Sequence, residues 1–289
     1  MFERILVGTD FSAPSAAVLS CVPQLMRVGV REVILGHVVY VANTPGLEEL
    51  LEQQARPLLE GMAQKLRDAG LQVTTDIRMG IPAVVLAEMA QAHEVAAIVV
   101  GSHGRSTLAR TLLGSVSSGL LHQTMRPVLI VRVSICESTE GTTCEVVCSE
   151  LFDKVLFPTD FSDGSEHAFH HLTGIVAETH SACTLLHVQD EVRLKHMTAQ
   201  LGEFNTIDAE RLERLKSELV SAGATAVDTT VRLGKPIRVI VEEATQRGHS
   251  LIVMGTRGRG ALAEVMVGSV AMNTARLAPI PVLFVPSQC

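Results

Sequence analysis

The feature that most constrains this fold is an internal repeat, because one sequence pattern runs through the chain twice. The segment FERILVGTDFS (residues 2–12) returns as FDKVLFPTDFS (residues 152–162). Further along, AAIVVGSHGRSTLARTLLGSVS (residues 96–117) returns as SLIVMGTRGRGALAEVMVGSVA (residues 250–271). The matching segments keep the same order in both halves, with a small insertion in the second copy. The chain is therefore expected to hold two copies of one domain.

The seam between the copies reads SICESTEGTTCEVVCSEL and contains four glutamates but no Lys or Arg. Its Ser, Thr and Gly content and its one-sided charge are typical of a solvated linker. We therefore expect a first domain over residues 1–133, a linker over residues 134–151 and a second domain over residues 152–289. The spacing of the six cysteines predicts neither a disulfide framework nor a zinc knuckle.

Within each copy, short β-branched runs alternate with stretches that have helical spacing, which predicts an α/β fold with a five-stranded parallel sheet and helices on both faces. Composition supports this fold. Hydrophobic residues make up 47% of the chain and aromatic residues only 3%, so the core must be aliphatic, as in buried parallel strands. In such folds ligands bind at the carboxyl ends of the strands.

The strongest functional pattern is a glycine motif, G-2x-G-9x-G-[ST], which follows a buried strand in each copy. Its members are Gly101, Gly104, Gly114 and Ser115 in the first copy, and Gly255, Gly258, Gly268 and Ser269 in the second. Glycines let backbone N–H groups approach an anion, and a helix start adds unsatisfied N–H donors and a positive dipole. The alternative is that these glycines only permit tight turns. Because the motif occurs twice at an expected helix start, phosphate binding is favoured.

Charge and the absence of other motifs exclude several classes of function. The net charge of −7 and the scarcity of aromatic side chains argue against nucleic-acid binding. No run of apolar residues reaches membrane-spanning length, and MFERILVGTD enters a strand without signal-peptide regions, so we expect a cytoplasmic protein with no membrane partner. No Walker lysine, nucleophile–base pair or repeated His/Glu metal set is found, so no catalytic residue and no metal-ligating side chain is predicted.

The glycine motif, the V-V-G-[ST] strand end and the Asp after the first strand together resemble the universal stress protein family. The resemblance covers nearly all of the chain except the linker. It implies two tandem Rossmann-like domains of the adenine nucleotide alpha hydrolase type, with ATP or another adenine nucleotide as ligand. It further implies that Asp10 and Asp160 lie near the ribose, and Val39 and Gln189 near the adenine.

The residues expected to bind the nucleotide include the neighbours of the glycine motif. In full they are Asp10, Val39, Gly101, Gly104, Arg105, Gly114, Ser115, Val116 and Ser117 in the first copy, and Asp160, Gln189, Gly255, Gly258, Arg259, Gly268, Ser269 and Val270 in the second. A magnesium ion would enter with the phosphates.

The residues themselves leave several alternatives open. Asp10 and Asp160 suit helix N-caps as well as a ribose contact. His37 and His187, on the second strand of each copy, are expected to be buried and hydrogen bonded.

Three further histidines, His167, His170 and His171, have helical spacing that could hold a metal, but a solvated helix face is the preferred interpretation.

The two copies differ beside the expected pocket. Gly8 corresponds to Pro158, and Ser117 corresponds to Ala271, so the second helix start has one hydroxyl fewer. Both sites are expected to bind, but unequally, with fuller phosphate coordination in the first.

The sequence therefore predicts an adenine-nucleotide-binding regulator or sensor of the stress response, with slow hydrolysis at most. Two alternatives remain: an ATP hydrolase or phosphotransferase that uses the same loop, and a nucleotide-free scaffold for protein interactions. The resemblance implies that the two domains pair through their fifth strands, VLIVRV and VLFVPS. Further self-association and an unidentified protein partner are also expected.

Overall fold

The computed structural model describes residues 2–40, 46–102, 113–138, 141–146, 148, 150–195, 201–258 and 267–287. The chain divides into two compact units, Met1–Ser149 and Glu150–Cys289. Each unit is built around its own parallel sheet, which confirms the predicted α/β fold with one sheet in each repeat.

The sheet of the first unit has the strand order β3-β2-β1-β4-β5, and all neighbouring strands are parallel. Its strands are β1 (Arg4–Thr9), β2 (Glu32–Val39), β3 (Gln72–Met79), β4 (Ala97–Gly101) and β5 (Val128–Val131). The chain moves outward from β1 to β3 and then returns to the other side of β1 with β4. The carboxyl ends of β1 and β4 therefore lie at the point where the strand order reverses, where α/β sheets bind ligands.

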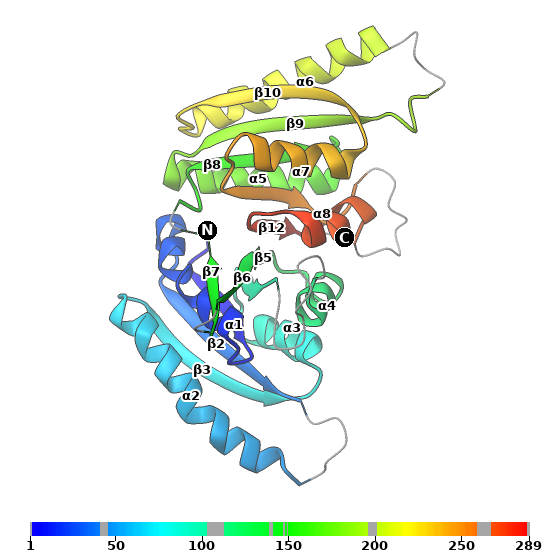
Figure 1. The fold of residues 1–289 in the computed structure, drawn as a ribbon. Helices are drawn as coiled ribbons and strands as arrows, with labels where there is room; N and C mark the ends of the chain where they lie inside the picture. The colour runs from blue at the N-terminus through cyan, green and yellow to red at the C-terminus, as the bar shows by residue number, and fades with distance from the viewer. Residues whose placement is uncertain are drawn as a thin grey trace. The chain divides into compact units, whose positions relative to one another are not determined.

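Helices cover both faces of this sheet, as Figure 1 shows. They are α1 (Ala13–Leu19), the 3₁₀ helix η1 (Val22–Val28), α2 (Glu48–Asp68), α3 (Pro82–Ala92) and α4 (Ser115–Gln123). Helices α1 and α2 contact one face, and α3 and α4 pack against each other on the opposite face. Two contacts show which face of the sheet each helix covers. Thr9 is hydrogen bonded to Ser15 of α1 on one face, whereas Gly8 faces Leu86 of α3 on the other.

The second unit repeats this architecture with the order β10-β9-β8-β11-β12, also parallel throughout. Its strands are β8 (Lys154–Thr159), β9 (Ala182–Asp190), β10 (Val227–Gly234), β11 (Leu251–Gly255) and β12 (Val282–Val285). Its helices are α5 (Asp163–Thr179), α6 (Leu201–Ser221), α7 (Pro236–Gln246) and α8 (Ser269–Leu277). Pro158 is tolerated on β8 because the pairing with β11 covers only Val155 and Leu156.

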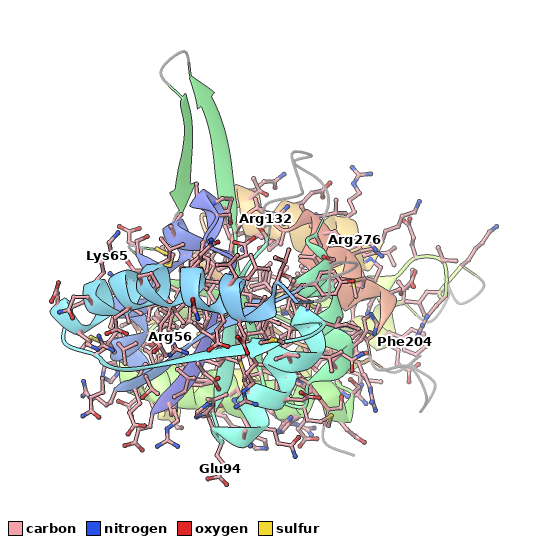
Figure 2. The ribbon with its side chains drawn as sticks, turned by 90° about the horizontal axis from the view of Figure 1, so that it is seen from below. Arg56, Lys65, Glu94, Arg132, Phe204 and Arg276 are labelled. Atoms are coloured by element: carbon pink, nitrogen blue, oxygen red, sulfur yellow. A yellow bond between two sulfur atoms is a disulfide. The ribbon has the colours of Figure 1, made fainter. Side chains whose placement is uncertain are left out.

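Local sequence explains where these elements form. Helix α2 buries Ala55, Leu59, Ala63 and Leu66, which recur every three or four residues and so form one stripe against the sheet. Between them lie charged side chains such as Arg56, which is labelled on this helix in Figure 2 and forms an ion pair with Glu52 one turn earlier. The central strands β1 and β4 instead bury nearly every residue, as expected for parallel strands covered on both faces, whereas the outer strand β3 has only exposed and half-buried residues.

The segment expected to be a linker contains an antiparallel hairpin. Strands β6 (Val133–Ser138) and β7 (Gly141–Val146) pair from Val133–Val146 to Ser138–Gly141. Figure 2 shows the two strands extending beyond the body of the first unit, and the hairpin contacts α1. Backbone pairing thus satisfies polar groups that the composition alone suggested would be solvated.

The cysteine spacing predicts no disulfide framework, but the structure contains a disulfide. Cys21, just before η1, is bonded to Cys148, just after the hairpin. The two cysteines are 127 residues apart in sequence, so their spacing carries no motif. Only the folding of α1 and the hairpin brings them together. None of the described helices is both long and apolar enough to cross a membrane.

Candidate functional site

Each unit has a cavity at the carboxyl ends of its first and fourth strands. The first cavity has a volume of about 470 Å³. Among the residues that line it are seven of the expected binding residues: Asp10, Val39, Gly101, Gly114, Ser115, Val116 and Ser117. These residues come from four separate segments of the chain, and the fold brings them to one place.

The start of α4 forms one wall of the first cavity. Gly114 is the N-cap, and its N–H donates to the carbonyl of Ser102 at 2.8 Å, which holds the helix start against the end of β4. No side chain in the described part of the chain caps this helix. The first-turn N–H groups of Ser115, Val116 and Ser117 have no acceptor within the helix, because none precedes them. This wall therefore offers donors and a positive helix end to an anion.

The hydroxyl of Ser117 has a structural contact in addition to its place in the cavity wall. Ser117 is 3% exposed, and its Oγ donates to the carbonyl of Gly101 at 2.6 Å. This bond joins the first turn of α4 to the end of β4. Ala271, its counterpart in the second unit, has no hydroxyl to make this bond, so the two units differ in how the helix start is held to the fourth strand.

Asp10 organises the turn between β1 and α1. Its Oδ1 accepts from the backbone N of Ser12 at 3.0 Å and from the Ser12 hydroxyl at 2.5 Å. Ser12, not Asp10, is the N-cap of α1, because its Oγ accepts from the N–H of Ser15. Phe11 between them has φ of 61°, the left-handed region, so the chain turns sharply here. The turn holds the Asp10 carboxylate at the cavity wall.

The second cavity has a volume of about 350 Å³ and repeats these features. Asp160 accepts from the N and Oγ of Ser162 at 3.1 and 2.6 Å, and Gly268 donates to the carbonyl of Thr256 at 2.7 Å. A Cβ on Gly258 would collide with Oδ2 of Asp160. A side chain at this position would therefore displace the Asp160 carboxylate, and glycine leaves it in place. The expected residues that line this cavity are Asp160, Gly255, Gly258, Gly268, Ser269 and Val270.

Gln189 does not line the second cavity, which changes the expectation for its role. Neighbouring side chains of a strand point to opposite faces, and Val188 and Asp190 face the cavity instead. Gln189 is 4% exposed and its Nε2 donates to Oδ2 of Asp208 on α6 at 2.9 Å. Its counterpart Val39 does line the first cavity, because that cavity continues around the strand ends toward α2.

The expectation for the strand histidines holds for His187, which is 7% exposed and donates from Nδ1 to the carbonyl of Thr159 at 2.8 Å. His37 makes the same bond to the carbonyl of Thr9 at 2.8 Å, but it is only partly buried.

The histidines of α5 differ from the expected solvated face. His170 is exposed, but Nδ1 of His167 donates to the carbonyl of Pro286, and burial together with the other two imidazoles lowers the pKa of His171 to about 4.

Three expected residues, Gly104, Arg105 and Arg259, lie outside the described residues. The cavities also contain residues that were not among those expected. These are chiefly Thr9, Val38, Tyr40, Pro82 and Leu86 in the first unit, and Thr159, Val188, Arg193, Pro236 and Arg257 in the second. The alternation of side chains along the second strand could have indicated Val38 and Val188. Arg193 lies in a variable connection that carries no motif.

Comparison with known proteins gives a consistent result across the chain. Residues 1–132 and 151–286 match the universal stress protein family. A universal stress protein of Mycolicibacterium smegmatis is 29% identical over 97% of this chain and 96% of its own length. The universal stress protein MJ0577 of Methanocaldococcus jannaschii is 29% identical, and the alignment covers 46% of this chain and 96% of that protein. The crystal structure of a universal stress protein from Archaeoglobus fulgidus covers both chains fully, with a TM-score of 0.77 and 26% identity.

Proposed function

Because this chain belongs to the universal stress protein family, we propose that it is an adenine-nucleotide-binding regulator or sensor of the stress response. The observation that carries the proposal is the repeated cavity: in both units an uncapped helix start, a glycine strand end and an aspartate line one space. Each element is at the reversal point of a parallel sheet, where α/β folds bind nucleotides.

The phosphates would lie at the start of α4 in the first unit and of α8 in the second. N–H groups in the first turn, Ser115–Ser117 and Ser269–Ala271, would donate to phosphate oxygens, and the helix dipole favours the negative charge. In the second unit Arg257 lines the same cavity and would add a positive charge. A magnesium ion would be held by the phosphates rather than by a protein cage.

The ribose and base would lie at the opposite end of each cavity. Asp10 and Asp160 would accept hydrogen bonds from the ribose hydroxyls, since their carboxylates are held at the wall by the turn that follows the first strand. The base would lie against the end of the second strand, on the face of Val38 in the first unit and of Val188 in the second; Val39, which was expected near the adenine, lines the first cavity from the opposite face of that strand.

Nucleotide binding would change the surface around these strand ends, and a protein partner in the cytoplasm would recognise that change. This would be the basis of regulation. We further propose that the two units pair through β5 and β12. Each is the edge strand of its own sheet, and VLIV and VLFV have no charged side chain to discourage strand pairing. The chain would then associate further with itself.

The test is to purify the whole protein, denature it, and identify and count any released nucleotide by chromatography and mass. About two equivalents of adenine nucleotide per chain are expected, or about one if only one unit retains its ligand. Protein that carries none would be titrated with ATP and Mg²⁺ while its melting temperature is followed. No release and no stabilisation would contradict the proposal and favour a nucleotide-free scaffold.

The same preparation tests the enzymatic alternative. ADP and phosphate that accumulate well above the background rate, and that fall to background in a Gly114→Ala variant, would indicate an ATP hydrolase. Binding without turnover would support the regulator.

A further inference from the structure

The first cavity has an extension that the second lacks. Besides the strand ends and the glycine motif, the first cavity is lined by residues of α2, chiefly Leu51, Gln54, Ala55 and Leu58. The equivalent helix of the second unit, α6, contributes none of the described residues that line the second cavity. We call the extension between α2 and the ends of β1 and β2 the α2 lobe.

The two helices can be matched residue by residue. Leu59 and Leu66 are fully buried on α2, and Leu212 and Leu219 are fully buried on α6 at the same spacing. This register pairs Ala55 with Asp208 and Leu58 with Arg211. On the second strand, the paired histidines His37 and His187 pair Val39 with Gln189. Three apolar positions of the first unit are therefore polar or charged in the second.

In the second unit these three side chains form one network. Asp208 is 8% exposed and accepts from Nε2 of Gln189 at 2.9 Å; its Oδ2 also lies 3.4 Å from Nε2 of His187. Nη1 of Arg211 lies 3.7 Å from Oδ1 of Asp208, and its guanidinium carbon lies 5.3 Å from the centre of the Phe161 ring. Each of these groups contacts another member of the network, and none of the three lines the second cavity.

In the first unit the same space has apolar and aromatic walls. Phe11 and His37 stack with ring centres 4.1 Å apart, and both line the cavity together with Val39 and Ala55. Leu58, where Arg211 stands in the other unit, is 56% exposed, so the lobe opens at the surface. An apolar group that covers a large exposed leucine at the mouth of a cavity binds favourably, because apolar surface is removed from water.

The difference in volume sets the size of the group that the lobe can hold. The first cavity measures about 470 Å³ and the second about 350 Å³. An apolar cavity of roughly 150 Å³ is large enough to hold a benzene ring. The additional space is therefore of the order of one aromatic ring or a short branched acyl chain.

The position of the lobe indicates where such a group would be attached. In the strand order β2-β1-β4, the lobe lies at the end of β2, Asp10 and Phe11 follow β1 in the middle, and the glycine motif follows β4 on the far side. In the proposed function, Asp10 contacts the ribose. A substituent that enters the lobe would therefore leave the nucleotide from its ribose, and not from its phosphates.

We propose that the first unit binds an adenine nucleotide whose ribose 2′ or 3′ hydroxyl carries an aromatic or apolar acyl group, with that group in the α2 lobe. The second unit accepts only the unsubstituted nucleotide, because the substituent would have to displace the buried Asp208 network. The inference rests on the proposed function and adds a difference in ligand class between the two units.

The experiment compares ATP with 2′/3′-O-(N-methylanthraniloyl)-ATP, a fluorescent ribose ester, on the full chain. Calorimetry is expected to give two ATP sites but one tight site for the ester, with its fluorescence raised by the apolar lobe. Leu58→Arg should weaken binding of the ester at that site about tenfold relative to binding of ATP. Leu50→Arg is the matched control, because Leu50 lies on α2, is 49% exposed and does not line the cavity.

The second unit provides the reciprocal variant. Replacing the network by its counterparts, Gln189→Val with Asp208→Ala and Arg211→Leu, should create a second tight site for the ester. Equal binding of the ester by both units of the unmodified protein, or no effect of Leu58→Arg, would overturn the inference while ATP binding stands. Failure of both ATP and the ester to bind would overturn the proposed function as well.

Discussion

Two glycines of the second motif, Gly255 and Gly268, provide a test that separates folding from phosphate binding. A Cβ on Gly255 would lie 2.6 Å from the carbonyl oxygen of Gly164 and 3.3 Å from the backbone N of Ser165. A Cβ on Gly268 would lie 3.5 Å from the carbonyl oxygen of Thr256, an ordinary contact. The first glycine is needed for the close approach of β11 and α5, and the second is not needed for packing.

The expected effects on stability follow from these distances. Gly255→Ala forces backbone atoms of α5 to move, which typically costs about 1–3 kcal/mol. In both variants alanine restricts the unfolded chain, which raises the free energy of unfolding by about 0.5–1 kcal/mol. In Gly268→Ala this gain is offset by a loss of similar size, because alanine is a poorer N-cap than glycine. Gly255→Ala should therefore be less stable than the unmodified protein, and Gly268→Ala should nearly equal it.

The expected effects on binding are different. The new methyl of Gly268→Ala would lie between the start of α8 and the loop of Arg257 and Gly258, about 4.0 Å from the N of Gly258. A phosphate that approaches both elements would lose at least one charge-assisted hydrogen bond, worth about 1.5–3 kcal/mol. The second site should therefore weaken about 10- to 100-fold, while the first site is unchanged.

Urea denaturation gives the stabilities, and calorimetric titration with ATP and Mg²⁺ gives the number and affinity of the sites. The unmodified protein should show two sites, and Gly268→Ala one tight and one weak site. Two sites of unchanged affinity in Gly268→Ala would refute the assignment of phosphates to this helix start. A Gly255→Ala protein as stable as Gly268→Ala would refute the reasoning from close approach.

Three further predictions concern the scaffold. Cys148→Ser removes the link that closes a loop of 127 residues, so the non-reduced protein should lose up to about 5 kcal/mol in urea denaturation, and dithiothreitol should abolish the difference. Burial raises the pKa of Asp76, but hydrogen bonds from Arg78 and His93 outweigh it and place the pKa below its ordinary value. Asp76→Asn should therefore be destabilising at neutral pH, and the difference in urea midpoint should shrink as the pH falls below about 4. Burial lowers the pKa of His249 to about 4, so the unfolded chain takes up the proton first and stability should fall as the pH drops from about 6.5 toward 4. In His249→Gln, the fall in melting temperature between about pH 6.5 and 4 that this histidine causes should be absent.

Much of the fold and of the candidate site could be predicted from the sequence because the signals are local. The repeat shows that there are two domains, and alternating strand and helix patterns predict a parallel sheet. The glycine motif is tied to a strand end and a helix start, so residues such as Gly101 and Gly114 must meet wherever that connection folds. These features depend on backbone geometry, which a short stretch of sequence specifies.

What only the tertiary structure decided involves residues far apart in sequence. Cys21 meets Cys148 because the hairpin contacts α1, and neither segment carries a motif that indicates the pairing. The packing of α6 turns Gln189 from an expected base contact into a partner of Asp208. The α2 lobe exists because the first unit has the small side chain of Ala55 at the helix position where the second unit has Asp208. Such differences arise because packing between elements depends on side chains that only the complete fold brings together.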